Sequence, residues 1–439
     1  MASAVRRVHP AWIVASVAFL ALVGAAGFRA APSVMMVPIQ DEFGWSRGLL
    51  STAVGVNLVL FGLTAPFAAA LMERFGIRKV TSIALTVVAT GAGLSIFVTE
   101  PWQIVVTWGV LIGLGTGSMA LVFAAVVTDT WFVQRRGLVS GILTAGSAMG
   151  QLIFLPFLAL LVTHSGWRAA SLLVAGAALA VVPLVLLWLR NSPAEIGLHP
   201  YGYVAPLGDV QAAPVSDART HDGVGPARRA IQTLLAASRV RTFWALVAGF
   251  AICGATTNGL IGTHFIPSAH DHGMAETTAA GLLAVVGVFD VVGTITSGWL
   301  TDRYDPRILL GGYYAFRGVS LLLLPALLSA TIHPSIVVFV VIYGLDWVAT
   351  VPPTVALCRE VFGKDGSVVF GWVFASHQIG AALAAVGAGF VRDRTGTYTA
   401  AWVSAAALCV VAAVVSIGIG RGKRDSPDPL PDPENEVAA

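Results

Sequence analysis

Apolar runs long enough to cross a bilayer recur along most of the chain. A helix rises about 1.5 Å per residue, so about 20 apolar residues span the hydrocarbon layer of roughly 30 Å. Runs of this kind predict twelve transmembrane helices, which begin near Ala11, Gly48, Val80, Trp102, Gly137, Ala169, Phe243, Thr278, Ile308, Ser335, Val368 and Ala400. The first run, at about 25 residues, exceeds the core of a signal peptide, which has roughly 7–15 residues, so we interpret it as a helix.

Polar breaks divide these runs into two groups of six, residues 1–190 and 241–420. The longest break, residues 191–240, is rich in Pro, Gly, Asp and Arg and predicts a linker. The polar, Pro-rich residues 421–439 predict a disordered tail. Of the 26 Lys and Arg residues, 20 fall on the side of the N-terminus and 4 on the other side. This asymmetry predicts that both termini and the linker are cytoplasmic, in a cell membrane.

The two halves carry matching motifs at a nearly constant spacing. Glu73-Arg74, after the second run, is matched by Asp302-Arg303 after the eighth. Gly113-Leu114 in the fourth run is matched by Gly344-Leu345 in the tenth. The offsets between matching motifs lie between 229 and 231 residues. Such a repeat predicts two pseudo-symmetric six-helix bundles, that is, an all-α membrane protein.

Composition supports a bilayer environment and narrows the classes of function. The chain is 56% hydrophobic and only 11% charged, whereas soluble domains are about 45–50% apolar and 25% charged. The net charge of +3 and the three scattered cysteines indicate no nucleic-acid partner, disulfide framework or metal site. No phosphate-binding GxxxxGK[ST] motif and no nucleophile–base set occurs in the sequence. We therefore expect that the protein binds no cofactor and is not an enzyme. The expected partners are the lipid bilayer and a small molecule, and we expect a monomer.

Ionisable residues inside the predicted helices are the candidates for chemistry, because a charge is costly to bury in a membrane. Counted from the cytoplasmic helix ends, Asp290, Asp346, Arg317 and His377 lie about 14–20 Å deep, near the midplane. Arg29 lies about 27 Å along the first helix.

The motifs resemble those of the major facilitator superfamily over essentially the whole chain. The loop signature of that family is similar to residues 69–79, although Glu73 replaces the usual Asp, and it recurs at residues 298–307. A narrower resemblance is to the monocarboxylate and oxalate:formate transporter branch, carried by WFVQRRGLVSGILTAGS at residues 131–147. The acidic Gly-rich signature of that branch is absent before the first helix, where VHPAW stands.

The resemblance implies a major facilitator fold in which a central cavity holds the substrate. In this fold, helices three, six, nine and twelve face outward, so Arg317 on helix nine does not easily reach the substrate. The side chains on cavity-lining helices give the predicted substrate-binding set, which is Arg29, Asn57, Gln151, Asn258 and His377. The guanidinium of Arg29 can bind a carboxylate through two hydrogen bonds, or it can extend to headgroups or pair with Asp41 or Glu42. His377 is a candidate proton carrier or an interhelical contact, and the amides are candidates for either role.

Asp290, Asp346 and Arg317 form the predicted proton-coupling set. Arg317 either neutralises one of the acids permanently or is released for anion binding when the acid takes up a proton. The sequence does not decide which acid pairs with it. In the resembled branch, an acid and a base lie one turn apart on helix eight, but Thr294 stands one turn after Asp290.

The predicted gating residues are Glu73, Arg74, Asp302, Arg303, Pro352 and Pro353. The four charged residues would latch the cytoplasmic side, unless they are solvated loop charges. The two prolines would make helix ten bend beside Asp346, or fix a static kink.

These features predict a secondary transporter that moves a small organic anion, a mono- or dicarboxylate, by alternating access and with protons. The alternatives are an efflux transporter for lipophilic or cationic compounds, and a membrane sensor without transport.

Overall fold

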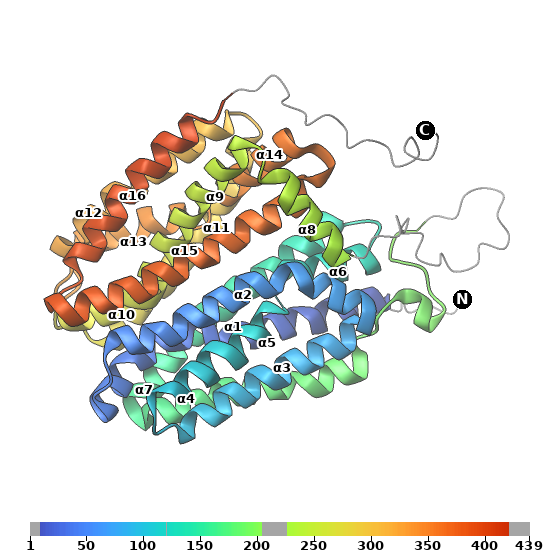
Figure 1. Ribbon diagram of the computed structural model, residues 1–439. Coiled ribbons are helices and arrows are strands. Elements are labelled where there is room, and N and C mark those ends of the chain that lie inside the picture. Colours follow the sequence, from blue (N-terminus) through green and yellow to red (C-terminus); the bar gives the residue numbers. More distant parts are fainter. Residues whose placement is uncertain (1–8, 120, 204–225, 421–439) are drawn as a thin grey trace, which may run out of the picture.

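The computed structural model describes residues 9–119, 121–203 and 226–420. In this part of the chain the helices form two bundles that lie side by side (Figure 1). The bounds of the first bundle are α1 Pro10–Phe43, α2 Arg47–Phe75, α3 Ile77–Leu94, α4 Pro101–Ile104, α5 Ile112–Gly117, α6 Leu121–Trp131 and α7 Arg136–Trp188. Those of the linker helix and the second bundle are α8 Pro226–Ala237, α9 Arg241–Gly254, α10 Gly262–Asp271, α11 Glu276–Thr301, α12 Pro306–Leu327, α13 Pro334–Asp346, α14 Val351–Phe362, α15 Gly366–Thr395 and α16 Thr399–Ile417.

These elements combine into the predicted twelve passes: α1, α2 and α3 are the first three, α11 and α12 are the eighth and ninth, α13 and α14 together form the tenth, and α15 and α16 are the last two. Ten helices in the described residues are long and apolar enough to cross a membrane. The long helix α7 contains a non-helical residue, Gly166 with φ 80°, where the chain reverses between the fifth and sixth passes. The fourth pass is interrupted by the π-helical segment η2 (Val105–Leu111) between α4 and α5. A second π-helical segment, η4 (Ala255–Ile261), joins α9 to α10 in the seventh pass.

Large apolar side chains cover the outer faces of the bundles. Examples on the third, sixth, ninth and twelfth passes are Ile83, 64% exposed, Leu187, 61%, Phe316, 67%, and Val414, 66%. A soluble protein of this size would not leave so much apolar surface in water, whereas lipid tails solvate it well. Exposed apolar side chains of this kind occur on all four passes that the resembled fold places outside. They also occur on other passes, such as the eighth, where Ile295 is 69% exposed, and the eleventh, where Leu383 is 71% exposed.

Glycines allow close packing inside the bundles, where interhelical contacts are made largely by small residues. A Cβ atom at Gly113 of α5 would lie 3.0 Å from the Cα atom of Asn57, so this glycine lets the fourth pass lie directly on α2. A Cβ atom at Gly254, at the end of α9, would overlap the carbonyl of His377 on α15.

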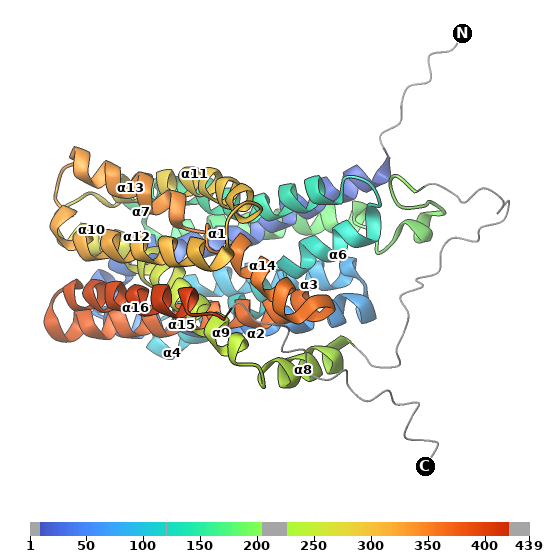
Figure 2. The same cartoon turned by 90° about the horizontal axis from the view of Figure 1, so that it is seen from above.

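The bundles meet along α1–α10, α2–α15 and α7–α11. We call the end of the molecule at which α1 begins and α16 ends the terminal side, and the opposite end the far side (Figure 2). The linker helix α8 lies at the terminal side and contacts both bundles, because Trp372 Nε1 of α15 donates to Ala230 O at 2.9 Å and α8 also packs on α2.

Candidate functional site

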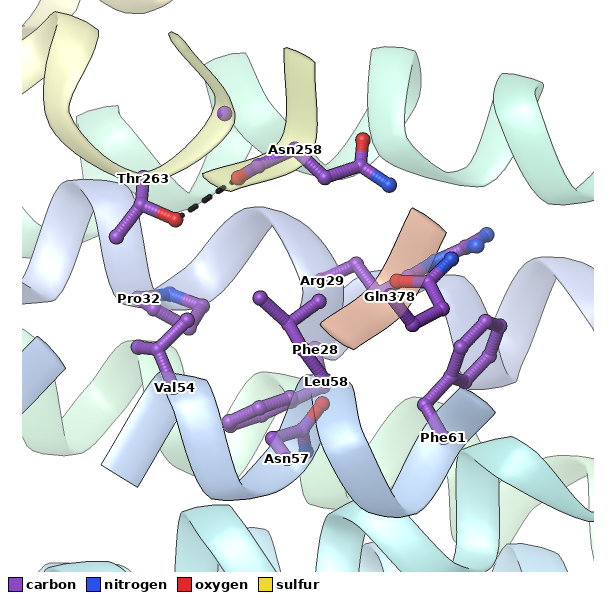
Figure 3. Close-up of a pocket in the computed structure, with 11 residues that line it drawn as sticks. Phe28, Arg29, Pro32, Val54, Asn57, Leu58, Phe61, Asn258, Thr263 and Gln378 are labelled. Atoms are coloured by element: carbon purple, nitrogen blue, oxygen red, sulfur yellow. Dashed lines mark hydrogen bonds between the residues drawn. The ribbon is translucent and has the colours of Figure 1, made fainter. Parts of the chain in front are cut away.

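A cavity lies between the bundles, and its volume is about 70 Å³. Its lining comes from both halves of the chain (Figure 3): Phe28, Arg29, Pro32, Val54, Asn57, Leu58, Phe61, Asn258, Gly262, Thr263 and Gln378. A cavity needs about 10–15 Å³ to hold one water molecule, so this cavity is large enough for water or a small solute. This space suits a molecule of a few non-hydrogen atoms, because drug-sized ligands fill pockets of about 300–1,000 Å³.

Arg29 is the one charged side chain among these lining residues. Its guanidinium carbon lies 5.8 Å from the centroid of the Phe61 ring, a distance at which the ring face attracts a cation. Glu42, considered above as a partner for Arg29, instead accepts from Arg168 and from Trp167 Nε1 at the far side. The cavity therefore presents positive charge beside an aromatic wall.

Asn57 and Asn258 both line the cavity, and each is tied to a π-helical segment. Asn57 Nδ2 donates to Trp108 O in η2 at 2.7 Å. Asn258 is part of η4, and its carbonyl accepts from Thr263 Oγ1 at 3.0 Å. Irregular helical turns have spare carbonyls that need a donor, and they are frequent at functional sites. The amide of Asn57 is thus engaged in interhelical contact, while the Asn258 side chain extends into the site in Figure 3.

The structure places Gln378 in the cavity lining, where the sequence pointed to the adjacent His377. His377 is 8% exposed, packs on the rings of Phe250 and Phe374, and is not among the lining residues. A helix turns about 100° per residue, so neighbouring residues face different surroundings. A polar residue in an apolar run was a signal for Gln378 as much as for His377. The side chain of Gln151, the remaining predicted contact, lies outside the described residues.

The predicted proton-coupling residues lie together in the second bundle, away from the cavity lining. Arg317 Nε donates to Asp346 Oδ2 at 2.6 Å, so Asp346 is the acid that pairs with this arginine. The side chain of Arg317 is fully buried, and that of Asp346 is 7% exposed. Asp290 lies beside the same turn, where its Oδ1 accepts from Val348 N at 3.0 Å and from Thr294 Oγ1 at 3.1 Å.

Arg317 also joins three passes of the second bundle. Its Nη1 donates to Cys253 Sγ at 3.1 Å and to Thr256 Oγ1 at 3.4 Å on the seventh pass. Its Nη2 donates to the carbonyls of Asp346 at 2.6 Å and Trp347 at 3.2 Å on the tenth pass. All its donor atoms are engaged, so Arg317 acts as a structural link in this conformation.

The break in the tenth pass lies before the two prolines. Residues 347–350 form turns, and Pro352 and Pro353 stand in the first turn of α14, where proline is well tolerated. The carbonyls that lose helical partners find others, since Arg317 serves two of them and Ser297 Oγ donates to Ala349 O. The interruption beside Asp346 is therefore held together by the buried arginine.

The charged loops predicted to latch the terminal side show no ion pair between bundles in the described residues. Arg74 lies over the ring of Phe75 at 5.3 Å, and Arg303 lies over that of Trp299 at 4.1 Å, each within its own helical region. Asp302 follows the last residue of α11 as its C-cap. The side chain of Glu73 lies outside the described residues.

The far side carries a network between bundles that the sequence did not predict. Arg47, at the start of α2, binds both carboxylate oxygens of Asp271 at 2.8 Å, and Arg392 Nε binds the same acid at 2.7 Å. Asp393 accepts from the backbone N–H groups of Arg47 and Gly48, so an acid of one bundle caps the N-terminus of a helix in the other. Tyr398 OH accepts from Arg47 Nη1 at 3.2 Å.

Comparisons with known proteins identify the family to which the chain belongs. The profile described as Major Facilitator Superfamily matches residues 17–365 and 246–438. The chain belongs to the major facilitator superfamily. This superfamily member is 26% identical to the MFS-type transporter YcxA of Bacillus subtilis (strain 168), which is described as uncharacterized, over 93% of each chain. It is 27% identical to monocarboxylate transporter 13 of Rattus norvegicus, over 92% of this chain and 88% of that one.

This superfamily member is 26% identical to human monocarboxylate transporter 11, and the match covers 93% of this chain and 83% of the human one. Among solved structures, a bacterial homologue of the lysosomal transporter Spinster, in an inward-facing and unoccupied conformation, superposes with a TM-score of 0.70. That match has 17% identity and covers 93% of this chain and 97% of that one. The sequence-based identification of the family and of an all-α membrane fold is confirmed.

Breaking the far-side network is expected to open that side of this superfamily member. Asp271→Asn removes the charge that holds Arg47, and a hydrogen bond to a charged group is worth about 1.5–3 kcal/mol. With Val54→Cys in the cavity, labelling from the far side by an impermeant thiol reagent should rise roughly tenfold or more. Glu42→Gln is the control, since it breaks an exposed pair with Arg168 within one bundle. Equal labelling in the two variants would contradict a closing role for Asp271.

Proposed function

We propose that the protein is a secondary transporter of a small organic anion, with monocarboxylates as the substrate class. The observation that carries this proposal is the small cavity between the bundles, whose one charged lining residue is Arg29. A guanidinium binds a carboxylate through two parallel hydrogen bonds between opposite charges, whereas a neutral solute lacks that charge and a cation is repelled. The names of the relatives, monocarboxylate transporters 11 and 13, support the same class.

The closed far side supports alternating access. With the termini in the cytoplasm, as the distribution of Lys and Arg predicts, the network around Arg47 and Asp271 seals the outside. Among the described residues, Arg74, Asp302 and Arg303 form no ion pair across the bundles, which agrees with an inward-facing state. During transport, the network on the far side would break and ion pairs on the terminal side would form, as the two rigid bundles rock about the cavity.

Proton coupling would involve the buried cluster of Arg317, Asp346 and Asp290. With both acids ionised, one guanidinium faces two carboxylates, so the cluster carries a formal charge of −1 inside the membrane. One proton makes it neutral, and buried uncompensated charge is costly. Asp346 Oδ1 is buried with no hydrogen-bond partner among the described residues, so it is a suitable proton acceptor. Protonation would weaken the pairing with Arg317 and release the turn at residues 347–350.

Uptake of labelled lactate into proteoliposomes, with and without a pH gradient, tests this function. An acidic exterior should stimulate uptake, because a proton then enters with each anion. Asp346→Asn should abolish the stimulation but retain exchange of internal for external lactate, since the amide mimics the protonated acid. Asp129→Asn, an exposed residue of α6, is the control and should behave as wild type.

Each contrary result has a distinct meaning. Stimulation that persists in Asp346→Asn would remove Asp346 from the coupling proposal. Absence of uptake and exchange for lactate and for other small carboxylates would contradict the organic-anion assignment. Transport of lipophilic cations in the same vesicles would instead favour the efflux alternative.

A further inference from the structure

Gln378 is a buried polar residue to which the transport proposal assigns no role. Gln378 is 2% exposed and lines the cavity. Its Oε1 atom has no hydrogen-bond partner among the described residues. Figure 3 shows the Gln378 amide among the lining residues, where it overlaps the side chain of Arg29 in this view. Buried acceptors are nearly always hydrogen-bonded in folded proteins, so an unsatisfied one at a binding cavity points to a donor that arrives with the ligand.

Close packing holds Gln378 in this place. A Cβ atom at Gly62 of α2 would lie 2.7 Å from the Cβ atom of Gln378, so the glycine accommodates this side chain. On the other side of α15, Gly254 accommodates the backbone of His377. Helices from both bundles therefore confine this part of α15 and hold the Cβ atom of Gln378 close to α2.

We infer that Gln378 determines substrate specificity by accepting a hydrogen bond from a hydroxyl group beside the carboxylate of the substrate. The inference rests on the proposed function, in which Arg29 binds the carboxylate. Arg29 and Gln378 line the same cavity, so a polar group bound by Gln378 would lie on the same small molecule as the carboxylate bound by Arg29. The assigned substrates are thus 2-hydroxy monocarboxylates. A 2-oxo acid of the same size has no proton to donate and places one oxygen against another, so it binds more weakly.

Transport by the unmodified protein gives the first test. KM values for exchange are measured at one fixed pH for lactate and pyruvate, and for 2-hydroxybutyrate and 2-oxobutyrate. Within each pair the molecules have the same number of carbons and the same charge. One net hydrogen bond predicts a KM about tenfold lower for the hydroxy acid. Equal values, or a preference for the oxo acid, would overturn the assignment of an acceptor at Gln378.

The variant Gln378→Met gives the second test, since methionine has nearly the same length and neither accepts nor donates strongly. The KM for the hydroxy acid should rise about tenfold to match that of the oxo acid, while the KM for the oxo acid stays unchanged. A purely structural role would move both values together. Gln232→Met, at an exposed position of α8, makes the same chemical change outside the cavity and should leave both values unaltered.

Gln378→Asn provides a second variant, because it keeps the amide but withdraws the oxygen, and it should also reduce the preference for the hydroxy acid. A preference that persists in Gln378→Met overturns the inference and leaves the proposed function intact. If neither member of a pair is transported or exchanged, the proposed function itself fails, and the inference with it.

Discussion

Arg317→Met is expected to destabilise the second bundle by about 3–5 kcal/mol, the cost of removing one partner from a buried ion pair. The change leaves Asp346 as an unpaired carboxylate and takes the donors from the carbonyls of Asp346 and Trp347. It also weakens the link between the seventh and tenth passes, because Cys253 and Thr256 lose their contact with the guanidinium. Thermal unfolding of the purified protein in detergent measures the loss.

A double variant distinguishes the charge from the packing. Arg317→Met with Asp346→Leu removes both charges, and apolar replacement of a whole buried pair is often close to neutral. We expect the double variant to recover most of the lost stability, while remaining insensitive to a pH gradient in transport. An Arg317→Met variant as stable as wild type would show that Asp346 is already neutral in the folded protein.

Arg29→Gln is expected to raise the KM for a monocarboxylate by roughly 10–150-fold, since a hydrogen bond to a charged group is worth about 1.5–3 kcal/mol. Glutamine keeps polarity and much of the length but loses the charge and the paired donors. Arg29→Lys should recover part of the affinity, because lysine restores the charge without the planar fork. Uptake of labelled lactate over a range of concentrations measures the effect.

The control for this series is Arg229→Gln, which removes an exposed arginine whose pair with Asp365 has an N–O distance of 3.4 Å. Exposed pairs contribute about 0–1 kcal/mol, so its KM should match that of wild type. If Arg29→Gln and Arg229→Gln both transport like wild type, Arg29 does not bind the anion. A lower KM in Arg29→Gln would point to a cationic or neutral substrate.

The two sets of buried polar groups have different tasks in this arrangement. Arg29 and Gln378 face the cavity, where a substrate can exchange with water. Arg317 and Asp346 lie among packed helices, where their hydrogen bonds fix the turn at residues 347–350. Coupling between the sets would run through the seventh pass, because η4 contributes both Thr256 to the arginine and Asn258 to the cavity.

The positions of the helices and the ionisable residues within them followed from the sequence, because hydropathy and helical rise are local properties that a chain segment carries by itself. The repeat offset likewise indicated two related bundles, and the loop motifs indicated the family. The midplane depth of Asp290, Asp346 and Arg317 is a prediction of the same kind, since it depends only on the count of residues from a helix end.

Tertiary structure decided which groups meet, because this depends on how each helix is rotated and tilted against its neighbours. The pairing of Arg317 with Asp346, and the place of Gln378 rather than His377 in the cavity, are both consequences of helix rotation. Arg47 and Asp271 are 224 residues apart, and only the approach of the two bundles brings them together. The local sequence predicts that a charged residue lies in the membrane, and the packing of the helices determines the residue with which it pairs.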